Sequence, residues 1–204
     1  MKKIAVFCGS SAGPNEIYRT QAAALGRYLA ENKIHVVFGG GKVGLMGIMA
    51  DAALEAGGEV TGVIPGFLHV KEVAHSRLTE LITVDTMHAR KALIEEMVDG
   101  AIALPGGFGT LDELFEMLTW GQLGLHDKPV AVLNTHGFFN SLLSAIDRMV
   151  DEGFLKDLNR DMLLVSEHIE EVVDAMLAYR PPKVRKWIMD GDPNNDVPFK
   201  AASQ

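Results

Sequence analysis

The chain has 204 residues, 48% hydrophobic and 23% charged, which is the composition of a soluble globular protein. A single cysteine, Cys8, excludes an intramolecular disulfide and fits a reducing compartment. The net charge of −8 argues against nucleic acid as a partner, because a negative surface repels phosphate backbones. No run resembles a signal peptide or approaches the ~20 apolar residues that span a bilayer, so we expect a cytoplasmic protein without a membrane partner.

Short apolar runs alternate with longer amphipathic stretches along most of the chain. Most of the runs are continuous rather than alternating, as strands buried on both faces of a parallel sheet require. The amphipathic stretches supply the crossover helices that parallel strands need. In chain order we predict a strand over 4–8, a helix over 16–31, a strand over 36–38, a helix over 44–56, strands over 60–64 and 81–84, a helix over 87–98, a strand over 101–104, a helix over 110–123, a strand over 130–133, a helix over 138–151, a strand over 163–165 and a helix over 169–179.

This order predicts an α/β fold, a Rossmann-like doubly wound parallel sheet of about seven strands flanked by helices. Residues 1–180 would form one domain. Residues 181–204 lack periodicity and contain Pro-Pro, so we expect an extended or mobile C-terminal tail. Residues 65–77 carry no regular pattern and are predicted to form a longer loop.

Three glycine-bearing turns follow the first, second and fifth predicted strands, at residues 8–13, 39–47 and 105–110. Ligands of open parallel sheets bind beyond the carboxyl ends of the strands. Glycine lets the backbone approach a ligand, and the helix start that follows attracts anions. Each turn by itself could be a tight connection, but three on one rim predict a phosphate-bearing ligand. Candidate contacts in the first two turns are Gly9, Ser10, Gly40, Gly41 and Gly44.

The sequence favours a mononucleotide over a dinucleotide or ATP. Gly39, Gly41 and Gly44 satisfy G-x-G-x-x-G, but the strand that follows ends at 63–66 without the acidic residue that binds a ribose. This absence disfavours a nicotinamide-dependent oxidoreductase. A P-loop is excluded because Lys42 is not followed by serine or threonine.

Two cations stand near the start of the helix predicted over 87–98. Cations in this position oppose the helix dipole, so their presence needs a reason. Arg90 has Leu93 and Ile94 at the positions where a carboxylate partner would stand, which favours contact with an anionic ligand. Lys91 has Glu95 four residues on, so both a ligand contact and a surface ion pair remain open for it.

The run from Thr110 to Glu113 allows two interpretations. It matches a capping box, in which the threonine and the glutamate satisfy free amides at a helix start. Alternatively, Glu113 faces a ribose bound after the phosphate turn. Asp112 and Glu113 lie about 100° apart around a helix, so we do not expect both to face one bond. Glu116, one turn on, is a candidate for a supporting carboxylate.

Metal and cofactor chemistry find no support in the sequence. None of the seven histidines has the spacing of a metal site, and we expect neither a metal nor an organic cofactor. Cys8 ends a strand and is interpreted as a buried thiol. The apolar stretch of Met117, Leu118 and Trp120 suits a core or an interface between subunits.

The run of residues 105–113 resembles the P-G-G-x-G-T-x-x-E signature of the Lonely Guy family, the cytokinin riboside 5′-monophosphate phosphoribohydrolases formerly labelled lysine decarboxylase-like. The resemblance includes residues 8–11, 39–47 and 87–91 and spans roughly residues 3–180. Asp112 departs from the Glu-Glu that is frequent in the family. The decarboxylase label finds no support, because no lysine stands in an evident pyridoxal-phosphate context.

The resemblance implies a homodimeric hydrolase that acts in cytokinin biosynthesis. It would cleave the N-glycosidic bond of adenosine 5′-monophosphate (AMP), or of an N6-substituted AMP, to a free base and ribose 5-phosphate. By motif position Arg90 and Glu113 would be the catalytic pair, with Glu113 as general base or nucleophile. Implied nucleotide contacts are Lys91, Gly106, Gly107, Gly109, Thr110 and Asp112, with Glu72 and Thr119 by looser alignment. The alternative is a non-catalytic carrier of a nucleotide-like cofactor, of the molybdenum-cofactor carrier type.

Overall fold

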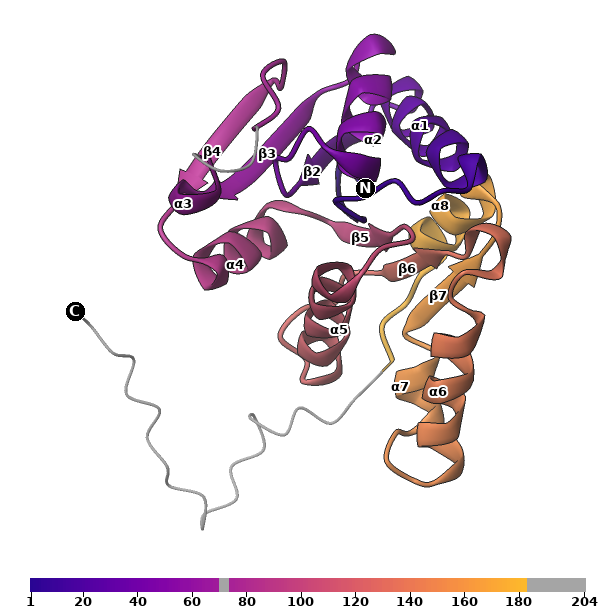
Figure 1. Ribbon diagram of the computed structural model, residues 1–204. Coiled ribbons are helices and arrows are strands. Elements are labelled where there is room, and N and C mark those ends of the chain that lie inside the picture. The colour runs from indigo at the N-terminus through magenta and orange to yellow at the C-terminus, as the bar shows by residue number, and fades with distance from the viewer. Residues whose placement is uncertain (70–73, 183–204) are drawn as a thin grey trace, which may run out of the picture.

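A seven-stranded parallel sheet forms the centre of the computed structural model, which describes residues 1–69 and 74–182 (Figure 1). The strand order is β4-β3-β2-β1-β5-β6-β7, which confirms the predicted fold class. The strands are β1 (Lys3–Phe7), β2 (His35–Phe38), β3 (Val60–Pro65), β4 (Glu80–Val84), β5 (Gly100–Ala103), β6 (Val130–Leu133) and β7 (Leu163–Ser166). The helices are α1 (Glu16–Glu31), α2 (Gly44–Glu55), α3 (Gly66–His69), α4 (Met87–Met97), α5 (Phe108–Gln122), the 3₁₀ turn η1 (Thr135–Gly137), α6 (Asn140–Asp151), α7 (Asp157–Arg160) and α8 (Ile169–Ala178).

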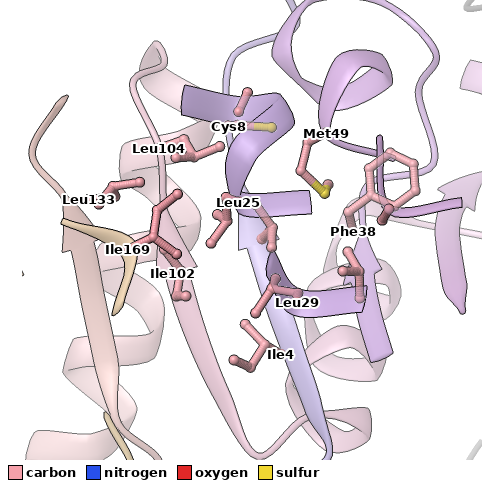
Figure 2. Close-up of a cluster of buried hydrophobic side chains, with 14 of the residues drawn as sticks. Ile4, Cys8, Leu25, Leu29, Phe38, Met49, Ile102, Leu104, Leu133 and Ile169 are labelled. Atoms are coloured by element: carbon pink, nitrogen blue, oxygen red, sulfur yellow. The ribbon is translucent and has the colours of Figure 1, made fainter. Parts of the chain in front are cut away.

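Two apolar cores lie on the two faces of the sheet. Successive residues of β1 point to opposite faces, so Ile4 joins one core and Ala5 the other. Helices α1, α2 and α8 cover the first face, where Leu25 and Met49 pack among strand residues (Figure 2). Helices α4, α5 and α6 cover the second face (Figure 1). Burial on both faces is the reason that the central strands β1, β5 and β6 are apolar, whereas the edge strand β4 is partly exposed and carries Glu80 and Thr83.

The strand order reverses between β1 and β5, which lie side by side although about a hundred residues separate them. The chain first winds outward from β1 to β4 and then returns to start the second half at β5. The main chains remain joined just beyond these strands, where Leu104 N donates to Phe7 O at 2.8 Å and Gly9 N to Pro105 O at 3.1 Å. The first and third glycine turns therefore meet at the crevice where doubly wound folds bind ligands.

The structure corrects several predicted elements. Helix α5 begins at Phe108, two residues before the predicted start, because Gly107 already serves as its N-cap residue. The region over 65–77 is not wholly a loop, since it contains the short helix α3. A 3₁₀ turn precedes α6, and α7 was not predicted because four residues carry no helical periodicity.

Some predictions fall outside the described residues. The structure describes only residues 181 and 182 of the predicted tail, and Glu72 also lies outside the described part of the chain. Within that part, no helix combines the length and the apolar character needed to cross a membrane.

Candidate active site

A cavity of about 250 Å³ opens at the carboxyl ends of β1, β2 and β5. All three glycine turns contribute to it, and α4 and α5 supply its charged side chains. We call it the Arg90–Glu113 cavity. It is lined by Val6, Cys8, Gly9, Ser10, Gly39, Met46, Leu68, Arg90, Gly107, Phe108, Gly109, Thr110 and Glu113.

Arg90 and Glu113 form an ion pair within this cavity, with 3.0 Å between Nη2 and Oε1. The two side chains are only 12% and 11% exposed. They come from different helices on the same face of the sheet, so the fold and not the local sequence brings them together. The structure therefore places the two predicted catalytic residues in contact.

The sequence makes room for Arg90 at two points. Its Nε donates a hydrogen bond to the Val63 carbonyl at 3.1 Å, which fixes the guanidinium against the end of β3. A Cβ atom at Gly39 would stand 2.1 Å from Arg90 Nη2, so any side chain there would displace the guanidinium. Gly39 is thus required by the close approach of Arg90, a role that the G-x-G-x-x-G pattern does not reveal.

The surroundings of Glu113 disfavour the ionised form of its carboxyl group. Burial raises its pKa above the ordinary value, Asp112 and Glu116 act in the same direction, and Arg90 and Lys91 oppose them. Although Oε1 lies close to Arg90, it is buried and accepts no hydrogen bond within the described residues. A buried oxygen with unused acceptor capacity is the arrangement expected of a group that acts on a ligand.

The capping-box interpretation of Glu113 is wrong. Helix α5 starts at Phe108, which makes Thr110 its third residue and puts Glu113 beyond the first turn. Gly107 occupies the N-cap position without a side-chain cap, so neither Thr110 nor Glu113 closes the helix start. The open amides of this turn border the Arg90–Glu113 cavity, where they can receive an anion.

Lys91 is held by two carboxylates of α5. Its Nζ lies 3.1 Å from Asp112 Oδ2 and 3.1 Å from Glu116 Oε2. Glu95, the surface partner that the sequence left open, instead pairs with Lys128. Asp112 is exposed while Glu113 is largely buried, which agrees with their expected separation around the helix.

The predicted glycine contacts divide into two groups. Gly9, Ser10, Gly107, Gly109 and Thr110 line the cavity itself. Gly40 and Gly41 do not; the Gly40 carbonyl accepts a hydrogen bond from His75 N, and Gly41 bridges to Ala74. Gly106 lines an adjoining hollow, and Gly44 packs on the Ser10 backbone.

Thr119 lies away from the cavity. It lines a separate groove of about 200 Å³ between α5, α6 and α7, together with Leu118. Met117, from the stretch predicted to suit a core or an interface, is buried in the core of its own chain. Sequence reasoning missed Met46 and Leu68 as lining residues, because an apolar side chain in a cavity wall gives the same signal as one in a core.

Cys8 lines the cavity but is buried, as predicted. Burial raises the pKa of its thiol, and the negative charge of Glu113 raises it further. Among the described residues, no group of three or more histidine, cysteine, aspartate and glutamate side chains is arranged to hold a metal ion.

Comparison with known proteins identifies the family. The model of the family described as "Possible lysine decarboxylase" matches residues 46–176. A cytokinin riboside 5′-monophosphate phosphoribohydrolase of Rhodococcoides fascians is 47% identical over 176 residues, 86% of this chain and 89% of the relative. The Arabidopsis thaliana enzyme of the same name, LOG5, is 46% identical over 180 residues, 88% of this chain and 79% of the relative.

Solved structures share the fold at lower identity. The molybdenum cofactor binding protein of Rippkaea orientalis has a TM-score of 0.66 at 20% identity and covers 87% of this chain and 97% of its own. The molybdenum cofactor carrier protein of Chlamydomonas reinhardtii has the same TM-score at 22% identity, with 87% and 99% covered. At such identity the likeness extends to the fold alone, whereas the sequence matches establish that the chain belongs to the Lonely Guy family of phosphoribohydrolases.

Proposed function

We propose that the protein hydrolyses the N-glycosidic bond of AMP or of an N6-substituted AMP, releasing the free base and ribose 5-phosphate. The observation that carries this proposal is the largely buried Arg90–Glu113 ion pair, both members of which line a cavity of about 250 Å³ together with the glycine turns. The relatives' names add the substrate class. A cofactor carrier on the same fold would have no need of this pair.

The chemistry follows from the bond that breaks. When C1′–N9 cleaves, the electron pair leaves with the base and the ribose becomes oxocarbenium-like. An ionised carboxylate nearby stabilises that positive charge, and more strongly in a desolvated site than in water. Water supplies the hydroxyl at C1′ and a proton for the departing base. Glu113 either accepts a proton from this water or attacks C1′ first, and both roles require its ionised form.

The 5′-phosphate has a matching place at the start of α5. The helix has fifteen residues, and its first amides follow Gly107 without a side-chain cap. Free amides and the helix dipole together attract an anion. A nucleotide with its phosphate there and its ribose over Glu113 would use both parts of the Arg90–Glu113 cavity.

The first test compares AMP with adenosine. Adenine release is followed by chromatography. We expect release from AMP and a far slower release from adenosine, because the helix amides recognise the phosphate. N6-isopentenyl AMP measured beside AMP identifies the preferred base. Equal rates for AMP and adenosine would contradict phosphate recognition, and no adenine from either would contradict the proposed function.

We also propose that residues 1–180 act as one catalytic domain in a cytoplasmic homodimer. The groove between α5 and α6 supports an apolar contact, and exposed side chains of Leu123, Leu125 and Phe154 lie on the same helical layer or its adjoining turns. Light scattering at micromolar concentration should give twice the 22.1 kDa chain mass. A monomer mass would contradict the dimer and leave the catalytic proposal untouched.

A further inference from the structure

Three charged side chains, Lys91, Asp112 and Glu116, form a second cluster on the helices that carry Arg90 and Glu113. Lys91 Nζ is 3.1 Å from Glu116 Oε2, and it donates hydrogen bonds to Asp112 Oδ2 at 3.1 Å and Oδ1 at 3.4 Å. Lys91 follows Arg90 on α4, and the two carboxylates flank Glu113 on α5. This second cluster therefore contains the sequence neighbours of both catalytic candidates, Lys91 and Asp112, and Glu116 one helical turn beyond Glu113.

The two carboxylates hold Lys91 unequally. The side chain of Asp112 is 59% exposed, whereas that of Glu116 is 22% exposed and that of Lys91 only 12%. Solvent weakens an exposed ion pair more than a partly buried one. Asp112 accepts the hydrogen bonds of the ammonium group, and Glu116 is the carboxylate whose attraction solvent screens less.

A small internal gap separates this cluster from the catalytic carboxyl. Its volume is about 10 Å³, and Lys91, Glu113 and Glu116 all line it. Lysine is a flexible point charge that can redirect its ammonium group. If Glu116 lost its charge, the buried Glu113 Oε1, which accepts no hydrogen bond, would become a competing acceptor for Lys91.

We propose that Glu116 is a positioning residue that holds Lys91 Nζ away from Glu113, so that the Glu113 carboxyl stays paired with Arg90 and open to the substrate. This role rests on the proposed function of Glu113. It gives a purpose to a carboxylate that has no place in the cavity wall.

The electrostatics of Glu113 agree with this arrangement. The charged groups that face it are Arg90 and Lys91 from α4 and Asp112 and Glu116 from α5, and the Cys8 thiol lies at the end of β1. Burial raises the pKa of Glu113 first, Asp112 and Glu116 raise it further, and the two cations lower it. Loss of the Glu116 charge would lower this pKa twice, directly and by releasing Lys91.

The experiment is the pH profile of kcat/KM for AMP cleavage by Glu116→Gln. The acid limb should move about one pH unit or more to lower pH, the size expected when an opposite charge approaches a carboxylate. Turnover should fall while KM changes little, because Lys91 would neutralise the carboxylate that faces C1′. Glu116→Asp, which keeps the charge, should restore most of the wild-type profile.

Two further variants separate the routes. Glu95→Gln removes a carboxylate that lines the same gap but pairs with Lys128, and it should leave the acid limb in place. In a Lys91→Met background the shift caused by Glu116→Gln should shrink, because the cation through which Glu116 acts is gone. An undiminished shift in that background would overturn the positioning role, as would an unshifted limb in a folded Glu116→Gln.

A readout without substrate keeps the two proposals distinct. Titration of ¹³C-labelled glutamate side chains by NMR, with Glu113 assigned by its loss in Glu113→Gln, measures the Glu113 pKa in wild type and in Glu116→Gln. A lower pKa in Glu116→Gln, by a shift that shrinks in the Lys91→Met background, supports the positioning role even if AMP is not cleaved. An unchanged pKa overturns it even if AMP is cleaved.

Discussion

The two ends of α4 carry two ion pairs that look alike and are used differently. Near the start, Arg90 and Glu113 are 12% and 11% exposed. Near the end, Lys128 and Glu95 are 21% and 20% exposed. Lys128 donates to both the side chain and the main-chain carbonyl of Glu95, whereas Glu113 Oε1 accepts no hydrogen bond.

We propose that this difference separates a structural pair from a reactive one. Lys128 also satisfies a carbonyl in the last turn of α4, where a cation complements the helix dipole. At the other end, burial of Glu113 is incompletely compensated, which is expensive for folding and useful for chemistry. Both pairs are largely buried, so burial of charge alone does not distinguish them; their hydrogen bonding and their place relative to the Arg90–Glu113 cavity do.

The sharpest way to break this comparison is Glu113→Gln, which is nearly isosteric. Adenine release from AMP should fall by about a hundredfold or more, because an electrostatic contribution of several kcal/mol is lost. AMP binding, measured by calorimetry, should persist through the amides of α5 and Arg90. Near-normal turnover would remove Glu113 from the mechanism.

The same variant has a stability signature that depends on pH. Because the folded-state pKa of Glu113 is raised, its contribution to stability is present at low pH and is lost as pH rises through that pKa. Glu113→Gln should therefore melt at or above the wild-type temperature at neutral pH. This difference should vanish below the ordinary glutamate pKa, and a large loss of stability at neutral pH would contradict the assignment.

Gly39→Ala sharpens the comparison by moving Arg90 and leaving the pair's charges in place. The new Cβ would stand 2.1 Å from Arg90 Nη2, so the guanidinium must shift. Turnover should fall by about tenfold to a hundredfold, the effect of a displacement of about 1 Å. The melting temperature should change little, since the clash is with the end of a side chain.

Two other glycine substitutions serve as controls for Gly39→Ala, one expected to be neutral and one expected to destabilise the fold. Gly66→Ala places a Cβ at ordinary contact distance, 3.6 Å from Thr83 Cγ2, and should leave turnover and stability near wild type. Gly44→Ala would put a Cβ 2.3 Å from the Ser10 backbone at φ +63°, so it should destabilise the fold. Gly39→Ala with unchanged turnover would show that Arg90 does not need its observed position.

The smallest catalytic effect is expected at the other end of α4. Lys128→Met removes both hydrogen bonds to Glu95 and should lower the free energy of unfolding by about 1–3 kcal/mol. Adenine release should remain close to that of wild type. Denaturant titration and the AMP assay measure the two quantities, and a loss of turnover without loss of stability would contradict the structural role of this pair.

The fold could be predicted from the sequence because the apolar runs, the helical periodicity and the positions of the glycines all indicated the same parallel sheet. Continuous apolar runs such as residues 60–64 have few alternatives to buried parallel strands, and glycine after a strand marks the carboxyl edge of the sheet. The place of Arg90 in a cavity wall, away from partners on its own helix, was also predictable, because the helix offered it no carboxylate at the right spacing.

Contacts between helices could not be predicted in this way. Lys91 pairs with Asp112 and Glu116 on α5 and not with Glu95 on its own helix. This pairing depends on how the two helices pack on the sheet. The start of α5 was misplaced because Phe108 and Gly109 are weak helix formers, and tertiary packing overrides such preferences. The close approach of the Arg90 guanidinium to Gly39 likewise could not be predicted, because the two residues are far apart in the sequence.

The state of Cys8 has a consequence for inhibitor chemistry. A cysteine in a ligand cavity ordinarily attracts electrophilic warheads, but the nucleophile in such reactions is the thiolate. Here burial and the neighbouring carboxylate both disfavour that form by raising the pKa of the thiol. Acrylamides and similar covalent groups are therefore poor choices against this pocket, and the enzyme should withstand alkylating reagents and mild oxidants without a protective reductant. Compounds that offer a cation or a hydrogen-bond donor to Glu113 are the better starting point.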